Sequence, residues 1–249
     1  MTRRAANASQ RDNWQPIVLD TAESIMQAIR GDGLSNRVGQ PDMLDIHVVH
    51  DADAFLQRMG AMPVRGDHGI NRRFLSLYMG LQPDEIILNK GKHGKPMLRQ
   101  RQPTFNFSHT DSWHGFAITR GGSIGVDVER LDRPLPSSLA QWLLPAPESG
   151  KHQVLEILRA HREIVAWTVN EAFVKALGCG MQDRNIGRFV ACYRHSAFSR
   201  CGHYRFVWME WRRWVFVSVL RYPIVATFAL RRDTCAALRK EQIRFVWYR

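Results

Sequence analysis

Residues 105–129 read FNFSHTDSWHGFAITRGGSIGVDVE, and this stretch decides the fold class. It contains three runs of strand-forming residues, separated by a short polar segment and by the Gly121-Gly122 pair. Phe, Val, Ile and Thr favour β-strands, and paired glycines favour a tight reversal of the chain. We therefore predict strands over 105–107, 115–119 and 124–129.

The segments on either side of this stretch mix helices with further strands. Apolar residues at helical spacing predict helices, and Gly80 and Gly178 supply left-handed caps that glycine adopts at little cost. Because strands and helices do not alternate regularly, we predict an α+β, or mixed α/β, fold. The expected elements are a loop-rich start over 1–42, strands over 45–50, 86–88 and 186–230, helices over 53–59, 71–79 and 151–177, and a helical tail from 235.

The composition excludes several classes of protein. The 249 residues are 45% hydrophobic and 23% charged, which is typical of a globular chain and excludes disordered, collagen-like and coiled-coil proteins. This length accommodates one large domain or two modest ones. The four cysteines include no C-x-x-C pair, so neither a zinc ribbon nor a redox dithiol is predicted, and the reducing cytoplasm is the expected compartment.

No membrane segment is expected. The most apolar stretch, residues 214–230, is interrupted by Arg221 and Pro223 and is shorter than the ~20 residues that a spanning helix needs. The first residues, MTRRAANASQRDNW, lack the apolar segment of a secretory signal. We therefore expect a cytoplasmic protein.

The positive charge is concentrated in the last quarter of the chain. The formal net charge is +12, and residues 184–249 carry 14 basic and three acidic residues. This asymmetry indicates either an acidic partner (nucleic acid, a membrane surface or an acidic protein) or simply a solvated basic face. Within it, residues 204–222 interleave aromatic residues with arginine, as a nucleic-acid site that stacks bases would. The same pattern is typical of half-buried strands, and we favour core strands.

Two short motifs carry groups that suit phosphate. Gly94-Lys95-Pro96 places a cation beside open backbone N–H groups, and Lys95 is one of only six lysines in the chain. Ser108-His109 places a hydroxyl and a titratable cation at a strand end. Each motif alone is equally an ordinary solvated turn.

Two further motifs carry carboxylates. In Gly125-Val126-Asp127-Val128-Glu129 the two acidic residues are two positions apart, so on a strand they share one face and call for a cation between them. Magnesium, which prefers oxygen ligands, suits that position, although an exposed acidic strand edge is the alternative. Glu171 and Lys175 lie four residues apart on one helical face, either as part of such a site or as a surface ion pair.

Taken in order, the four motifs resemble those of the Sfp-type 4′-phosphopantetheinyl transferases. That family's pattern is G-K-P, F-N-x-S-H, G-[IV]-D-[IV]-E and W-x-x-K-E-[AS]-x-x-K-x-x-G, which this chain matches within residues 65–180. The resemblance implies a pseudo-two-fold pair of similar α/β halves with the active site between them. We place the halves at 1–123 and 124–249 and expect a monomer.

The resemblance also implies an activity, in which phosphopantetheine moves from coenzyme A to a serine of an acyl, polyketide or peptidyl carrier protein. Adenosine 3′,5′-bisphosphate is released, and the reaction serves fatty acid, polyketide or nonribosomal peptide biosynthesis. Carrier proteins of this kind are acidic, which gives the basic C-terminal quarter a partner.

The implied site residues follow from the matching positions. Asp127, Glu129 and Glu171 would hold Mg²⁺, and Glu171 would also take the proton of the carrier serine, either directly or through a metal-bound water. Lys175 would neutralise the pyrophosphate as it breaks. The residues expected at the adenosine 3′-phosphate end are Lys95, Ser108, His109 and Arg65.

One position departs from the family pattern. Asn170 stands where the family usually has lysine, directly before Glu171. The loss of a cation beside a diphosphate leaves open a coenzyme A-binding homologue with weakened catalysis. The arginine-rich and aromatic tail leaves open an alternative of another class, a basic nucleic-acid-binding protein.

Overall fold

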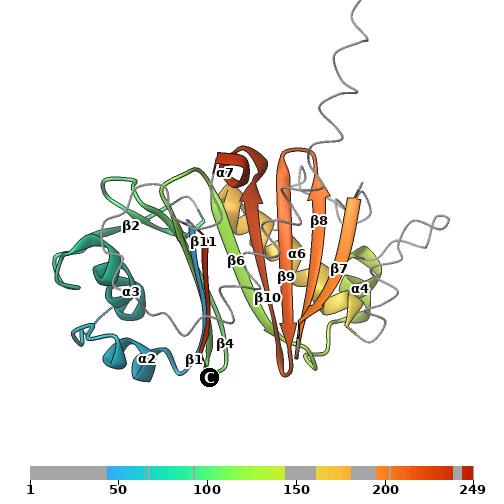
Figure 1. Cartoon of the computed structure of the whole chain (residues 1–249), viewed down its shortest axis with the longest axis horizontal. Helices are drawn as coiled ribbons and strands as arrows, with labels where there is room; N and C mark the ends of the chain where they lie inside the picture. The colour runs from blue at the N-terminus through green and yellow to red at the C-terminus, as the bar shows by residue number, and fades with distance from the viewer. Residues whose placement is uncertain are drawn as a thin grey trace, which may run out of the picture.

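The computed structural model describes residues 44–64, 66, 68–91, 93–143, 161–180, 195–201, 203–237 and 243–248. In this part of the chain the strands form two main sheets, with the orders β11-β1-β5-β4 and β6-β10-β9-β8-β7, and a β2-β3 hairpin (Figure 1). The strands are β1 (Leu44–His50), β2 (Leu88–Lys90), β3 (Pro96–Leu98), β4 (Thr104–Thr110), β5 (Trp113–Thr119), β6 (Ile124–Arg130), β7 (His195–Cys201), β8 (Tyr204–Trp211), β9 (Trp214–Arg221), β10 (Ile224–Arg231) and β11 (Ile243–Tyr248). The helices are α2 (Ala52–Arg58), α3 (Gly69–Met79), α4 (Ser137–Leu143), α6 (Arg162–Leu177) and α7 (Arg232–Ala237).

Helices α2 and α3 cover the outer face of the first sheet (Figure 1). The side chain of Asp51 caps α2 by accepting a hydrogen bond from the amide of Ala54, and Gly80 ends α3 in the left-handed conformation. Phe74 of α3 stacks on Phe116 of β5 with ring centroids 4.4 Å apart. Both predicted helices, 53–59 and 71–79, are confirmed.

Helix α6 covers the outer face of the second sheet. It ends where Gly178 takes a left-handed conformation, as predicted. Strands β6, β10, β9, β8 and β7 pair antiparallel throughout. Phe206, Trp208 and Phe216 in this sheet are buried, which confirms that the aromatic residues of 204–222 belong largely to core strands.

The inner faces of the two sheets pack against each other through an apolar core. The first sheet contributes Leu44, Ile46 and Phe245, and the second contributes Val126 and Phe228, all of them fully or almost fully buried. Alternate residues of each strand therefore enter this core, as the two-residue period of a strand requires. The layers run helices, sheet, sheet, helix, in agreement with the expected mixed α+β class.

The last strand returns to the first sheet. Strand β11 pairs in parallel with β1, with Phe245 opposite Ile46. The predicted helical tail from 235 is therefore wrong beyond α7, because Phe245 and Trp247, two residues apart, place large apolar groups on one face of a strand. A boundary at 123/124 stays a prediction, with the qualification that β11 belongs to the sheet of the first half.

Some expectations differ in detail or fall outside the described residues. The strand expected at 86–88 is β2 at Leu88–Lys90, and hydrogen bonds from Gly94 to Gly91 and from Gly91 to Lys95 lead into β3. The expectations for 1–42, 151–160 and 186–194 lie outside the described residues. None of the helices in the described ranges is both long and apolar enough to span a membrane.

Candidate active site

Strands β4 and β6 are edge strands of the two sheets, and side chains of β4 join them. The Oδ1 atom of Asn106 accepts a hydrogen bond of 2.7 Å from the amide of Val126, and Oγ of Ser108 accepts one of 3.4 Å from the amide of Val128. Asn106 and Ser108 are two residues apart and so point the same way. We call this junction, Asn106 and Ser108 with Val126–Glu129, the seam.

Gly125 brings α6 close to the seam. A Cβ atom at this position would lie 1.9 Å from the carbonyl oxygen of Ala172 and 2.6 Å from the amide of Ala176, so a larger residue would force the helix away. This close approach gives the glycine of the G-V-D-V-E motif a physical reason. Asp127 and Glu129 lie two and four residues after Gly125, so they face the same side of β6, which α6 covers. The residues between them, Val126 and Val128, face the core.

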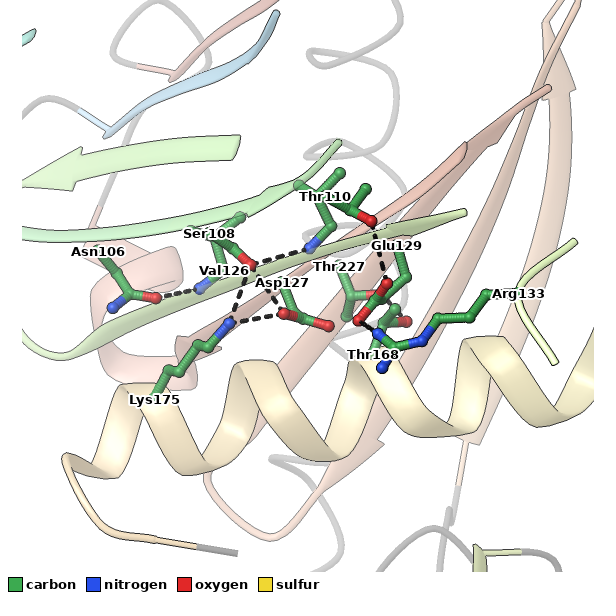
Figure 2. Close-up of polar contacts among 11 residues, drawn as sticks. Asn106, Ser108, Thr110, Val126, Asp127, Glu129, Arg133, Thr168, Lys175 and Thr227 are labelled. Atoms are coloured by element: carbon green, nitrogen blue, oxygen red, sulfur yellow. Dashed lines mark hydrogen bonds and ion pairs between the residues drawn. The ribbon is translucent and has the colours of Figure 1, made fainter. Parts of the chain in front are cut away.

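Three of the sequence motifs meet at Asp127. The ammonium Nζ of Lys175 lies 2.6 Å from Oδ1 of Asp127 and 2.9 Å from Oγ of Ser108, and that hydroxyl donates to the same carboxylate oxygen at 2.8 Å (Figure 2). The Asp127 side chain is only 4% exposed, against 28% for Lys175. Burial raises the pKa of Asp127, and the neighbouring ammonium of Lys175 opposes that rise.

Lys95 reaches the same end of α6 from the β2-β3 hairpin. Its Nζ donates to the carbonyl oxygen of Lys175 at 2.5 Å and to that of Ile124 at 3.4 Å. A cation at the carboxyl end of a helix is favourable because the last carbonyl groups carry partial negative charge. Burial lowers the pKa of Lys95 to about 8. Lys95 of the Gly94-Lys95-Pro96 motif thus adjoins Lys175.

The carboxylate of Glu129 lies at the other end of the seam. Its Oε1 accepts a hydrogen bond from Nη1 of Arg133, and its Oε2 accepts one of 3.3 Å from the hydroxyl of Thr110 (Figure 2). Neither Thr110 nor Arg133 was expected from the sequence, although Thr110 continues the alternation of Asn106 and Ser108 on β4. Arg133 follows β6 in a turn, where no periodic pattern predicts a direction.

Glu171 lies on α6 within the electrostatic reach of both strand carboxylates. Burial raises its pKa; Lys175 opposes the rise, Asp127 and Glu129 add to it, and Arg133 opposes it. The Glu171 carboxylate is therefore stabilised by the charges of Lys175 and Arg133, the two cations that pair with Asp127 and Glu129. We call Asp127, Glu129, Glu171 and Lys175 the carboxylate–lysine group.

The remaining predicted residues lie elsewhere. His109 is exposed, and its ring lies 5.8 Å from that of His114, on the face of the first sheet opposite to Ser108. Asn170 is fully buried, and its Nδ2 donates to the carbonyl of Ala166, on a different side of α6 from Lys175. Arg65 lies outside the described residues.

The carboxylate–lysine group suits a hard divalent cation by the type of its donors. Asp127, Glu129 and Glu171 all offer carboxylate oxygens, and Oδ2 of Asp127 is buried without a hydrogen-bond partner. Within the described part of the chain, no three His, Cys, Asp or Glu side chains are gathered closely enough to hold a metal ion as they stand. The donors fit magnesium by type. In this structure Lys175 pairs with Asp127, and Arg133 pairs with Glu129.

Comparison with known proteins finds one family that matches part of the chain. Residues 123–204, which include β6 and α6, match the family model described as 4′-phosphopantetheinyl transferase superfamily. This part of the chain is therefore similar to that superfamily. The motif resemblance is thus confirmed at the level of the family by a region that carries Asp127, Glu129, Glu171 and Lys175.

Individual members of the superfamily match over part of the chain. The 4′-phosphopantetheinyl transferase HetI of Nostoc sp. is 31% identical over 120 residues, which is 45% of this chain and 50% of HetI. The protein slr0495 of Synechocystis sp. is 30% identical over 141 residues, covering 47% of this chain and 57% of slr0495. The L-aminoadipate-semialdehyde dehydrogenase-phosphopantetheinyl transferase of Xenopus laevis is 27% identical over 39% of this chain and 37% of its own length. The chain thus spans about half the length of the first two relatives.

Proposed function

We propose that this protein transfers the 4′-phosphopantetheine group of coenzyme A to a serine of an apo carrier protein. The observation that carries the proposal is the meeting of three separate motifs, in which Nζ of Lys175 contacts both Asp127 and Ser108. The match of residues 123–204 to the superfamily model supports it independently. A pseudo-two-fold relation between the halves 1–123 and 124–249, with the site at the seam between the two sheets, is part of the same proposal.

Magnesium would be held by Asp127, Glu129 and Glu171, and when bound it would supply positive charge to the pyrophosphate of coenzyme A. Ser108 would bind a phosphate oxygen, because its hydroxyl lies beside the ammonium of Lys175. Lys95, together with His109 and Arg65, would bind the adenosine 3′-phosphate end. These assignments rest on motif positions and on the contacts of Lys95 and Ser108.

The reaction needs one bond formed and one broken. The serine oxygen of the carrier attacks the phosphorus that bears pantetheine, and the bond from this phosphorus to the bridging oxygen breaks. Adenosine 3′,5′-bisphosphate leaves with the bridging oxygen, whose negative charge Lys175 neutralises. The serine proton passes to Glu171, the carboxylate that lies on the helix rather than on β6.

The carrier is the proposed macromolecular partner. A net charge of +12, most of it after residue 184, favours an acidic domain. We expect the reaction to take place in the cytoplasm by a monomeric enzyme, and to serve fatty acid, polyketide or nonribosomal peptide synthesis.

The test is to mix the full chain with an apo carrier protein, coenzyme A and Mg²⁺, and to weigh the intact carrier by mass spectrometry. A gain equal to one phosphopantetheine group is the expected result. Asp127→Asn is expected to lower the transfer rate by about a thousandfold, since it removes a carboxylate whose work is done in the transition state. Glu171→Gln is expected to do the same, whereas Glu163→Gln, which changes a half-buried carboxylate in the first turn of the same helix, leaves the rate within about twofold.

Two other outcomes would replace the proposal. No mass gain across several unrelated carriers, with coenzyme A still bound, would establish a binding homologue without transfer. Tight, steeply salt-dependent binding to DNA or RNA with no binding of coenzyme A would establish the nucleic-acid alternative. The burial of Phe206, Trp208 and Phe216 argues against the latter, because these rings are not available to stack on bases.

A further inference from the structure

Two cations pair with carboxylates of the carboxylate–lysine group, and they come from different parts of the chain. Lys175 approaches Asp127 from the carboxyl end of α6, and Arg133 approaches Glu129 from the turn after β6 (Figure 2). Lys175 belongs to a motif of the superfamily pattern, whereas Arg133 belongs to none of the four. The question is therefore what Arg133 does at the second carboxylate.

Arg133 occupies an oxygen that the proposed metal needs. Its Nη1 contacts Oε1 of Glu129, while Thr110 donates to Oε2, so both oxygens of this carboxylate are engaged. The charge of Arg133 also opposes the rise that burial causes in the pKa of Glu171. A single guanidinium thus contacts one of the three carboxylates proposed to hold magnesium and acts on a second through its charge.

The exposure of the two partners makes this contact reversible. The side chain of Glu129 is 10% exposed and is fixed on strand β6, whereas that of Arg133 is 47% exposed and extends from a turn. Arg133 can therefore leave for solvent without uncovering the core. The unpartnered Oδ2 of buried Asp127 indicates that the group has capacity for a further cation.

We infer that Arg133 is a displaceable counter-ion, which neutralises Glu129 in the metal-free protein and must leave this carboxylate for a divalent cation to bind. The inference rests on the proposed function, because it assumes that Glu129 is a metal ligand. A guanidinium and a metal ion cannot share the same carboxylate oxygen, so Arg133 lowers the affinity for the metal. In its absence the three carboxylates repel one another, and a divalent cation relieves that repulsion more effectively.

The test uses Mn²⁺ as the probe and measures its binding to the full chain, without coenzyme A, by electron paramagnetic resonance of the free ion. Arg133→Gln is expected to lower the dissociation constant for Mn²⁺ by about three- to tenfold, and Arg133→Lys by about twofold, because a lysine keeps the charge without the planar fork. Arg130→Gln is the matched control: it removes the same charge three residues earlier, where Arg130 pairs with Asp132 and Asp111. The dissociation constant of this variant for Mn²⁺ is expected to change by less than about 1.5-fold, because an exposed charge pair contributes little.

Three results would overturn the inference. These are unchanged or weaker Mn²⁺ binding by Arg133→Gln, an equal change in Arg130→Gln, and no Mn²⁺ binding by any of the proteins. Circular dichroism confirms that each variant is folded, and if Arg133→Gln is not, Arg133→Lys alone decides by the same criterion. The carrier mass assay separates the two proposals: a wild-type protein that modifies carriers while Arg133→Gln binds Mn²⁺ no more tightly sinks this inference alone.

Discussion

The two sheets touch in two regions that are held together by different forces. Between their inner faces, Val126 and Phe228 pack against Ile46 and Phe245, with no polar group among them. At the seam, Asn106 and Ser108 instead bond to backbone amides of β6. Apolar burial is strong but has no direction, whereas a hydrogen bond fixes a distance and an angle. The interior therefore supplies stability, and the seam supplies position.

The largest effect is expected in the interior. Phe228→Ala removes a fully buried ring that meets Phe245 edge-on at 6.0 Å, and it should lower the free energy of unfolding by about 3–5 kcal/mol. Urea denaturation measures the change. Transfer per folded molecule should stay within about twofold, because β6 keeps its hydrogen bonds to β4. A large loss of transfer in the folded variant would show that interior and seam are not separable.

A substitution at the seam should show the opposite pattern, with a smaller loss of stability and a larger loss of transfer. Asn106→Ala leaves the amide of Val126 without its acceptor and should cost about 1–3 kcal/mol of stability. The transfer rate should fall by about tenfold or more, because Asp127 and Glu129 follow Val126 on the strand and lose their fixed position. Thr104→Ala, a shortened side chain two residues earlier on the same strand face, is the control and should change neither quantity appreciably.

The pH dependence of ligand binding separates Lys95 from the rest of the hairpin. Burial lowers the pKa of Lys95 to about 8, so its ammonium is charged at pH 7 and loses its proton as the pH rises through 8. Binding of adenosine 3′,5′-bisphosphate, measured by calorimetry, should weaken by about threefold or more between pH 7 and pH 9, because an anion binds the charged form. Lys95→Arg should keep the affinity constant over this range.

Lys90→Ala, an exposed lysine on the same hairpin, should retain the pH dependence of the parent. An unchanged dependence in Lys95→Arg would instead mean that another group titrates. Lys95 would then serve only to join the hairpin to the end of α6.

The smallest effect is expected at Asn170. Asn170→Ala removes one hydrogen bond to a carbonyl that the helix already uses, together with a buried oxygen that has no partner. Alanine is the better helix former, so stability should change by less than about 1 kcal/mol and transfer by less than about twofold. A larger loss of transfer would show that this position does act on the diphosphate, as the family's lysine at the matching place suggests.

The sequence predicted the elements of the site better than their contacts. The two-residue spacing of Asp127 and Glu129 placed both on one face of a strand, and the position of Gly178 placed the end of α6 correctly. The contact of Ser108 with Asp127 and Lys175 could not be derived, since it depends on how β4 and α6 meet β6 in three dimensions. Long-range pairing of this kind leaves no local signal in the chain.

The two corrections have different physical causes. The alternation in IRFVWY, residues 243–248, was a readable sign of a strand, so the helical tail from 235 was an avoidable error. The burial of Asn170 could not be predicted, because the sequence does not tell whether this side of the helix packs against protein or faces a ligand. Arg133 was missed for a similar reason, as a turn has no period from which a direction follows.

The parallel pairing of β11 with β1 has a consequence for synthesis on the ribosome. Strand β1 is made about 200 residues before β11, its partner on one side, so β1 has an open edge until residues 243–248 have been made. Contacts so distant in sequence close slowly and leave a strand edge available to other chains in the meantime. Shortening the chain before residue 243 is therefore expected to yield aggregated protein instead of a smaller folded unit.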